Sequence, residues 1–324
     1  MCIARRLQQI GGLHVSSDVP LAPYTRFGIG GPATLVCESS DTHAFETALR
    51  AVRESGTCHV VIAGGTNLIV SDAGFDGVVL RFTGTRISND GARLRVEAGL
   101  PLQSVVDHSI AIGLRGMETM TGIPGSLGAA VYGNAGAYGR SINECVQSVV
   151  FTDGDRKRVF ENAQCEFDYR ESIFKRNKDW IILSAELSFE PGDSKELRQR
   201  AGEIRAVRDA KYPPSMKCAG SIFKNCFFAR LPSAVQAMIP PNIVREGKVP
   251  SAWFLEQVGA KGMRAGDIQV ATYHANLIYN DGNGTAADLA KIITDLRQRV
   301  KDRFGFDIEE EVQYVGSIDS IIRY

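Results

Sequence analysis

The chain has 324 residues, which is enough for about two domains at roughly 150 residues each and for a large buried core. Apolar residues make up 44% and charged residues 23%, as in an ordinary globular protein. Lysine plus arginine and aspartate plus glutamate both number 37. This balance argues against a protein that binds nucleic acid, because such proteins carry a basic excess.

No segment approaches the roughly 18 consecutive apolar residues of a membrane-spanning helix. Two arginines near the start are not followed by an apolar stretch, so neither a signal peptide nor a membrane segment is expected. The seven cysteines are scattered without any Cys-x-x-Cys pair, so we expect no disulfide framework and no metal site. These features favour a protein of the reducing cytoplasm.

Up to about residue 190 the sequence mixes short strands and helices. Apolar residues at helical spacing (Phe45, Leu49 and Val52) predict a first helix that ends at Gly56. The predicted elements in chain order are a helix over 41–56, strands over 59–63, 78–82 and 93–98, a helix over 102–112, and strands over 147–152 and 180–189.

Two longer helices follow. The helix over 195–210 is rich in arginine, which is typical of a solvated face, and the break at 212–214 (YPP) is the best candidate for a domain boundary. The clearest helix covers 285–304, with Thr285 as its N-cap, Asp288 three residues further on, and Gly305 as its C-cap.

The 33 glycines make up about 10% of the 324 residues, against a usual share of about 7%. Many of them lie in two segments. The first, 63–67 (AGGTN), follows a predicted strand and could hold a diphosphate against backbone N–H groups, although a simple tight turn remains open. The second, 122–139 (GIPGSLGAAVYGNAGAYG), is dominated by small residues. It suits either a close helix–sheet contact or a bound cofactor.

Several motifs occur in a recognisable order: 24–33 (YTRFGIGGPA), the two glycine segments, 165–175 (CEFDYRESIFK), 219–225 (AGSIFKN), 253–262 (WFLEQVGAKG), 274–276 (HAN) and 304–316 (FGFDIEEEVQYVG). Together they resemble the UDP-N-acetylenolpyruvoylglucosamine reductases, also called UDP-N-acetylmuramate dehydrogenases, which are flavoenzymes of peptidoglycan precursor synthesis. The interval between Arg170 and Ser221 is short, like that of the subgroup that lacks an extra substrate-clamping loop.

The resemblance implies an α+β protein with an FAD-binding fold of the PCMH (p-cresol methylhydroxylase, vanillyl-alcohol oxidase-like) type in two subdomains over 1–205. It implies a C-terminal α/β substrate-binding domain over 206–308 and a segment over 309–324 that carries the catalytic glutamate back to the FAD region. The implied partners are non-covalent FAD, NADPH and UDP-N-acetylglucosamine enolpyruvate. We further expect a monomer that binds neither nucleic acid nor membrane.

The resemblance also implies roles for three residues. Hydride reaches the methylene carbon of the enolpyruvyl group, and charge develops on the neighbouring carbon. Arg170 would stabilise that enolate, a role that suits a permanent planar cation, although a structural salt bridge with Glu171 is the alternative. Glu311 would hydrogen-bond the enolate as a neutral carboxylic acid, whereas by sequence alone 309–311 is an ordinary acidic surface. Ser221 would deliver the proton to carbon, although it could be an ordinary turn residue.

The remaining implied site residues fall into two groups. Those expected to contact FAD are Arg26, Ala63, Gly64, Gly65, Thr66, Asn67, Leu68, Gly122, Ile123, Pro124, Gly125, Ser126, Gly128, Ala129, Asn134, Gly136 and Ala137. Those expected to contact the substrate are Lys211, Lys224, Asn225, Lys261 and His274. A single histidine is more often structural than functional, so that alternative stays open for His274.

Some departures and alternatives remain. Cys226 stands where the serine motif often has proline, and the apolar segment 227–248 has no implied role. The same FAD fold also serves oxidases of alcohols, sugars and lactones, many with covalently attached flavin. Neither glycine segment contains histidine or cysteine, but Cys58 and His59 precede the first one closely. A catalytically inactive regulator is a further alternative, which the presence of Arg170, Ser221 and Glu311 together disfavours.

Overall fold

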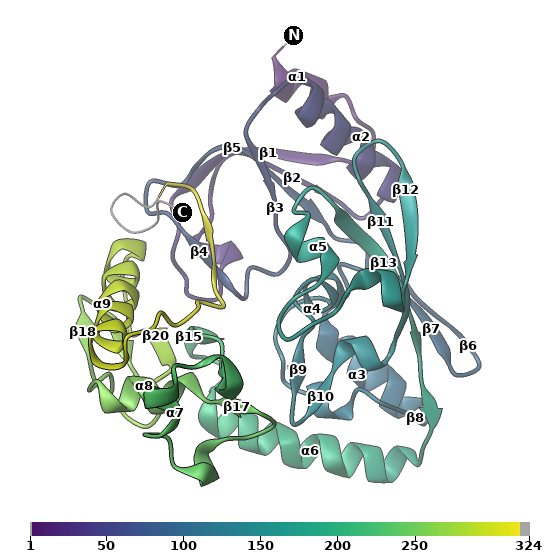
Figure 1. The fold of residues 1–324 in the computed structure, drawn as a ribbon. Helices are drawn as coiled ribbons and strands as arrows, with labels where there is room; N and C mark the ends of the chain where they lie inside the picture. Colours follow the sequence, from purple (N-terminus) through teal and green to yellow (C-terminus); the bar gives the residue numbers. More distant parts are fainter. Residues whose placement is uncertain (1, 318–324) are drawn as a thin grey trace. The chain divides into compact units, whose positions relative to one another are not determined.

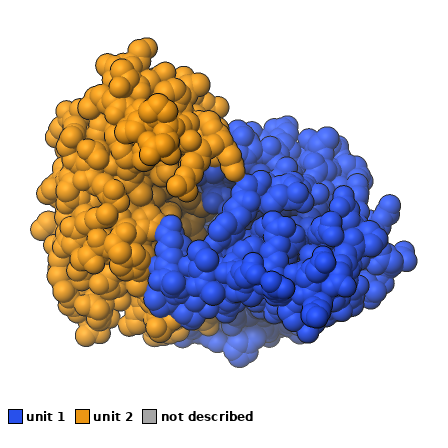
Figure 2. Space-filling model, turned by 90° about the horizontal axis from the view of Figure 1, so that it is seen from below, with its two compact units in different colours: residues 1–19, 33–64, 76–214 blue, residues 20–32, 65–75, 215–324 orange. Residues whose placement is uncertain are grey.

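The computed structural model describes residues 2–317, and the chain passes repeatedly between two units (Figures 1 and 2). Unit 1 holds the described residues up to 19, then 33–64 and 76–214; unit 2 holds 20–32, 65–75 and the described residues from 215. The division after Pro214 lies at the predicted break. The expected limit at residue 205 lies inside helix α6 (Ser194–Lys211), and two segments expected in the first region belong to unit 2.

One sheet of unit 1 has four strands in the order β1-β2-β5-β3. Their bounds are β1 (His14–Pro20), β2 (Pro32–Ser39), β5 (Phe75–Phe82) and β3 (His59–Val61). Helix α1 (Ile3–Gln8) contacts helix α2 (Thr42–Glu54). The predicted first helix is thereby confirmed, since the Asp41 side chain accepts the Ala44 N–H at 2.7 Å and Phe45, Leu49 and Val52 are fully buried.

The second sheet of unit 1 is antiparallel and has the order β12-β11-β13-β7-β6. Its strands are β12 (Lys157–Glu161), β11 (Val146–Thr152), β13 (Ile181–Ser188), β7 (Arg93–Glu97) and β6 (Ile87–Asp90). Helix α4 (Leu127–Tyr132), which lies inside the second glycine segment, contacts β13 and β7. The small residues of that segment are thus held against a sheet.

The rest of unit 1 surrounds these sheets. Helices α3 (Leu102–Ala111) and α6 contact each other and the 3-10 helix η2 (Glu118–Met120), which leads into the second glycine segment. The remaining elements are the pairs β8 (Leu114–Arg115) with β14 (Glu190–Pro191) and β9 (Gly136–Ala137) with β10 (Arg140–Ser141), the helix α5 (Ile173–Arg176), and the 3-10 helices η3 (Ile142–Glu144) and η4 (Asn162–Cys165).

Unit 2 is built on a four-stranded sheet in the order β15-β20-β19-β18. Its strands are β15 (Lys217–Ser221), β20 (Leu277–Asn280), β19 (Ile268–Val270) and β18 (Arg264–Ala265). Helix α9 (Ala286–Phe304) contacts β18 and helix α8 (Ser251–Gln257). Its predicted caps are confirmed: the Thr285 hydroxyl accepts the Asp288 N–H at 3.0 Å, and Gly305 has a φ of 73°.

A short parallel pair joins distant parts of unit 2. Strand β4 (Leu68–Val70) follows the first glycine segment and pairs with β21 (Gln313–Val315), which follows the acidic run. The segment 227–248 forms η5 (Phe228–Arg230), α7 (Ser233–Gln236) and η6 (Pro241–Ile243), and β16 (Cys226–Phe227) pairs with β17 (Lys248–Val249). Unit 2 also contains the 3-10 helix η1 (Ala22–Tyr24). Residues 318–324 of the expected C-terminal segment lie outside the described residues.

The mixture of helices with largely antiparallel sheets confirms the expected α+β class. Within residues 2–317, no helix combines the length and the apolar character needed to cross a membrane. The same residues contain no cluster of three or more His, Cys, Asp or Glu side chains able to hold a metal ion. All seven cysteines are free thiols.

Candidate active site

Arg170 lies in a tight turn of unit 1. The backbone N–H groups of Asp168 and Glu171 each donate to the carbonyl of the other residue, at 3.0 and 3.1 Å. The Tyr169 N–H donates to the Asp168 carboxylate at 2.7 Å. Arg170 therefore occupies the second central position of the turn and has a φ of 57°, a conformation that glycine usually fills. Holding a non-glycine residue there costs about 1–3 kcal/mol, which is a common cost at functional sites.

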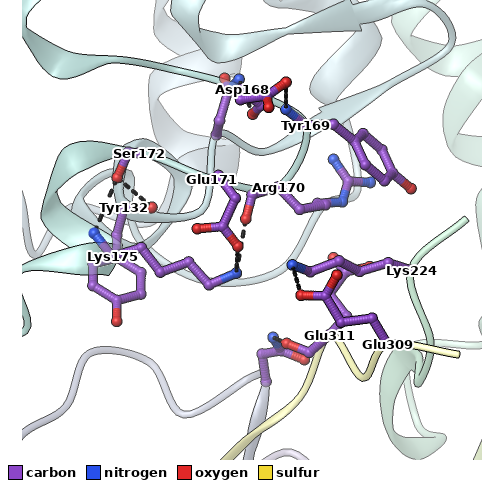
Figure 3. Close-up of polar contacts among 12 residues, drawn as sticks. Tyr132, Asp168, Tyr169, Arg170, Glu171, Ser172, Lys175, Lys224, Glu309 and Glu311 are labelled. Atoms are coloured by element: carbon purple, nitrogen blue, oxygen red, sulfur yellow. Dashed lines mark hydrogen bonds and ion pairs between the residues drawn. The ribbon is translucent and has the colours of Figure 1, made fainter. Parts of the chain in front are cut away.

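The arginine motif is bonded to the second glycine segment. The Arg170 guanidinium donates to the Gly136 carbonyl at 3.0 Å. The Ser172 hydroxyl donates to the Tyr132 carbonyl at 2.7 Å (Figure 3). The Asn134 amide donates to the Asp168 carbonyl at 2.9 Å and accepts the Asn143 N–H at 3.3 Å. Asn134, expected at the cofactor, thus links the second glycine segment to the arginine motif.

Some glycines of the second segment are required by the protein itself. A Cβ at Gly128 would lie 2.8 Å from the Ala98 Cβ, and one at Gly136 would lie 2.6 Å from the Arg140 carbonyl oxygen. Gly122 and Gly125 have φ values of 78° and 111°. The close helix–sheet contact considered from the sequence is therefore real, and it accounts for part of the small-residue pattern.

Other features of this segment fit a large, flat, uncharged group. Residues 122–139 contain no acidic side chain, and much of their backbone is only half-buried. The Thr119 hydroxyl, just before the segment, is buried and has no hydrogen-bond partner among residues 2–317. A ligand that accepts or donates a hydrogen bond there would satisfy it.

The first glycine segment is built against residues 24–26. The Arg26 N–H donates to the Gly65 carbonyl at 3.3 Å. A Cβ at Gly65, whose φ is 60°, would lie 1.7 Å from the Tyr24 carbonyl oxygen. Arg26 and Gly65, both expected at the cofactor, are therefore neighbours in unit 2. Gly64 is exposed, and Ala63, Thr66 and Leu68 are half-buried.

Asn67 makes a contact that the sequence did not reveal. Its side-chain amide donates to the Glu311 carbonyl at 2.7 Å, and its own carbonyl accepts the Gln313 N–H at 3.0 Å. Both bonds lie at the start of the β4–β21 pairing, in which Gln313 is opposite Leu68. The first glycine segment therefore fixes the backbone of the glutamate motif.

The structure distinguishes the three consecutive glutamates. Glu309 forms an ion pair with Lys224, and the Glu310 carboxylate accepts bonds from Arg297 at 3.0 Å and from the Tyr314 hydroxyl. The Glu311 backbone N–H donates to the Ile222 carbonyl at 2.7 Å, next to the serine motif. Glu310 has a side-chain exposure of only 9%, so the run is not the uniform solvated surface that composition suggests.

Ser221 ends strand β15 and is half-buried opposite Leu277. The register between β15 and β20 shifts between Cys218 and Ser221. Gly220, with a φ of 82°, lies within this shift. The buried Asn276 holds the residues that follow: its side chain accepts the Phe223 N–H at 2.9 Å and donates to the Phe223 carbonyl at 2.8 Å. Sequence reasoning did not single out Asn276 for this role.

The predicted substrate residues have different surroundings. Lys224 is 7% exposed, and its backbone N–H donates to the Glu309 carbonyl at 2.8 Å. The Asn225 amide oxygen accepts the Ser251 N–H at 3.4 Å. Lys261 is exposed and pairs with Glu256 at 2.8 Å, and Lys211 lies in unit 1 above the Tyr212 ring. Lys224 and Asn225 therefore share a segment with Ser221, whereas Lys211 belongs to the other unit.

Two further residues lie near the serine motif. His274 accepts the Asn276 N–H at 3.3 Å, which is a contact within its own short motif. The Cys226 thiol lies 3.8 Å from the Ser251 hydroxyl, and burial raises its pKa to about 11. This thiol stays protonated at neutral pH, so it is a poor nucleophile where the family often has proline.

Comparison with known proteins agrees with this organisation. An "FAD binding domain" family model matches residues 33–159, and the C-terminal domain model of UDP-N-acetylenolpyruvoylglucosamine reductase matches residues 212–315. A relative of that name from Solibacter usitatus is 59% identical over 311 residues, covering 96% of this chain and 100% of its own. One from Carboxydothermus hydrogenoformans is 33% identical and covers 93% and 94%.

Solved structures show the same relationship. The crystal structure of UDP-N-acetylenolpyruvylglucosamine reductase from Thermus caldophilus has a TM-score of 0.72 and 26% identity. It covers 94% of this chain and 99% of its own. With the full-length similarity to curated relatives, these findings confirm the resemblance inferred from the motifs: the chain belongs to the UDP-N-acetylenolpyruvoylglucosamine reductase family.

Proposed function

We propose that the protein reduces UDP-N-acetylglucosamine enolpyruvate to UDP-N-acetylmuramate with NADPH, using non-covalently bound FAD. The observation that carries this proposal is the 59% identity with a reductase of this name over that protein's whole length. The geometry supports it, because Arg170, Ser221 and Glu311 each lie in a backbone segment held by specific hydrogen bonds.

FAD fits the residues that the structure offers for it. The uncharged, half-buried segment 122–137 would contact the flavin, where the Thr119 hydroxyl needs a partner. The exposed backbone at Gly64 would hold the diphosphate, with Thr66 two residues further along the chain and Arg26 bonded to the Gly65 carbonyl. When bound, FAD supplies hydride transfer from NADPH to the enolpyruvyl group.

Arg170 and Glu311 act on the charge that develops beside the reacting carbon. Arg170 presents a planar cation on a turn that is already ordered, so its reorganisation during the reaction costs little. Glu311 donates a hydrogen bond to an oxygen of the same enolate. The Glu311 backbone is held by hydrogen bonds to Asn67 and Ile222. These contacts stabilise the enolate, which carries one more negative charge than the substrate, more than they stabilise the substrate, which is the requirement for catalysis.

Ser221 delivers the proton to the carbon that bears the carboxylate. A hydroxyl is a weak acid, so it can donate only after charge has formed on that carbon. Asn276 orders the backbone just after Ser221 and thereby limits where the hydroxyl can point. Lys224 and Asn225 follow on the same segment and bind anionic and polar parts of the substrate, and Lys211, Lys261 and His274 are proposed as weaker contacts.

We further propose that the protein is a cytoplasmic monomer with no nucleic-acid partner. Its formal net charge of zero supports the last point, because nucleic-acid binding requires a basic surface. We assign FAD binding to the region that contains residues 33–159 and substrate binding to the region that contains 212–315.

A spectroscopic experiment tests the proposed function. The purified protein should be yellow, lose its flavin absorbance when NADPH is added without oxygen, and regain it when the enolpyruvyl substrate follows. Acid precipitation should release the flavin into the supernatant. Flavin that stays with the precipitate, or that is reduced by an alcohol or sugar and not by NADPH, would instead identify an oxidase.

A further inference from the structure

Lys175 lies on the short helix α5, one turn after Arg170, and its ammonium group has two acceptors (Figure 3). It donates to the Arg170 carbonyl oxygen at 2.7 Å and to the Glu171 carboxylate at 2.9 Å. Its side chain is only 16% exposed. A lysine that is mostly buried is retained only when its charge is compensated, and Glu171 provides that compensation here.

The carbonyl that Lys175 binds belongs to the residue with the unfavourable backbone. Arg170 has a φ of 57°, a region where L-residues other than glycine are rare. Such a conformation persists only where surrounding groups hold it. The bond from Lys175 is made to the peptide group that leaves Arg170, so it restrains the backbone torsions that aim the arginine side chain.

We propose that Lys175 is a positioning residue for Arg170, acting on the Arg170 peptide group and not on the substrate. This inference rests on the proposed function, because Arg170 is the cation assigned to the developing enolate. Without the ammonium, the turn can relax toward an ordinary conformation, and the guanidinium then moves away from its place beside the Gly136 carbonyl.

The neighbouring residues separate this role from simple helix stability. Ser172 caps α5, accepting the Lys175 backbone N–H at 3.2 Å, so the helix start does not depend on the Lys175 side chain. Arg176, the next residue on the same helix, is exposed and pairs with Glu166. It offers a matched control, because its replacement also removes a cation from α5 while leaving the Arg170 carbonyl bonded.

The test measures the two half-reactions of the flavoprotein separately by stopped-flow absorbance. Lys175→Met keeps the apolar stem and removes the charge. Reoxidation of the reduced flavin by the enolpyruvyl substrate should slow by roughly 10- to 100-fold, the scale expected for a misplaced catalytic group. Reduction by NADPH should stay at the wild-type rate. Lys175→Arg should recover part of the loss, and Arg176→Met should match the wild type in both steps.

Glu171→Gln removes the ion pair but keeps the lysine–carbonyl bond, so it should lose much less than Lys175→Met. An equal loss in these two variants would overturn the proposal, as would equal slowing of both half-reactions in Lys175→Met or a wild-type rate of reoxidation. If Lys175→Met does not fold, Lys175→Gln is judged by the same criteria. Failure of the wild-type protein to reoxidise with substrate would overturn the proposed function itself and, with it, this inference.

Discussion

At the scale of single residues, the three glutamates at 309–311 have different surroundings despite identical chemistry. Glu310 is nearly buried and accepts hydrogen bonds from Arg297 and Tyr314 within unit 2. Replacing it with glutamine removes the negative charge that Arg297 binds and weakens the bond from Tyr314, so Glu310→Gln should lower the free energy of unfolding by about 2 kcal/mol. Urea unfolding followed by circular dichroism measures this loss.

Glu311→Gln should show the opposite pattern. Its backbone carries the bonds to Asn67 and Ile222, and these are unaffected by a side-chain change. The variant should unfold at the wild-type urea concentration and reoxidise its flavin with substrate roughly 10²-fold more slowly. A large fall in stability with normal flavin reoxidation would show that the roles of Glu310 and Glu311 are exchanged.

Ser221 acts only after charge has formed on carbon, so its replacement should affect only one half-reaction. Ser221→Ala should bind FAD and accept hydride from NADPH as the wild type does, but flavin reoxidation by substrate should fall on the order of 10²-fold. Ser221→Cys retains a transferable proton and should keep more activity than Ser221→Ala. In D₂O the wild type should place deuterium on the carbon bearing the carboxylate. Wild-type reoxidation by Ser221→Ala would leave Glu311 as the leading proton donor.

At the scale of single elements, the turn between β11 and β12 depends on one carboxylate. The backbone N–H of Arg156, then the Arg158 guanidinium and the Asp155 N–H, hold the pKa of Asp153 at about 2, below its usual value. A lowered pKa in the folded state adds stability above about pH 4, and that stability is lost as the pH falls toward 2.

Asp153→Asn should therefore be less stable than the wild type near pH 6, by about 1 kcal/mol once partial exposure to solvent is allowed for. The difference should shrink between pH 4 and pH 2. Urea midpoints measured across this range provide the test, with Asp155→Asn, an exposed neighbour in the same turn, as the control. A difference that does not change with pH would assign the effect to packing and not to charge.

At the scale of the whole molecule, each unit is assembled from separated parts of the chain. Phe27, Ile29 and Ile69 come from segments that precede residue 76 but are buried in the apolar core of unit 2. Strand β4 has its partner β21 at the other end of the sequence. Neither unit is a continuous stretch of chain.

A fragment ending at residue 214 should therefore not behave as an independent domain. It leaves Phe27, Ile29 and Ile69 without their core and β4 without a partner, so the fragment should bind a hydrophobic dye and aggregate. Adding the fragment from 215 onward should reduce both effects. Cooperative unfolding of the first fragment alone, without dye binding, would contradict this expectation.

The sequence by itself determined the elements and the residues whose signals are local. The helix over 285–304 has its cap, its apolar stripe and its terminal glycine within one segment, and the structure matches all three. The motifs around Arg170, Ser221 and Glu311 likewise lie within short stretches, so their order alone identified the family. Local backbone chemistry and the spacing of apolar residues carry this information without any knowledge of distant contacts.

Only the tertiary structure decided how these motifs support one another. The bond from Asn67 to Glu311 joins residues far apart in sequence, as does the bond between Asn276 and Phe223, and no local pattern announces either. The same holds for the assignment of 20–32 and 65–75 to unit 2. Even the Lys175 contact, only one helical turn away, depends on the left-handed backbone of Arg170. Such contacts are fixed by chain folding, because a hydrogen bond depends on where the chain brings its two groups and not on their spacing in sequence.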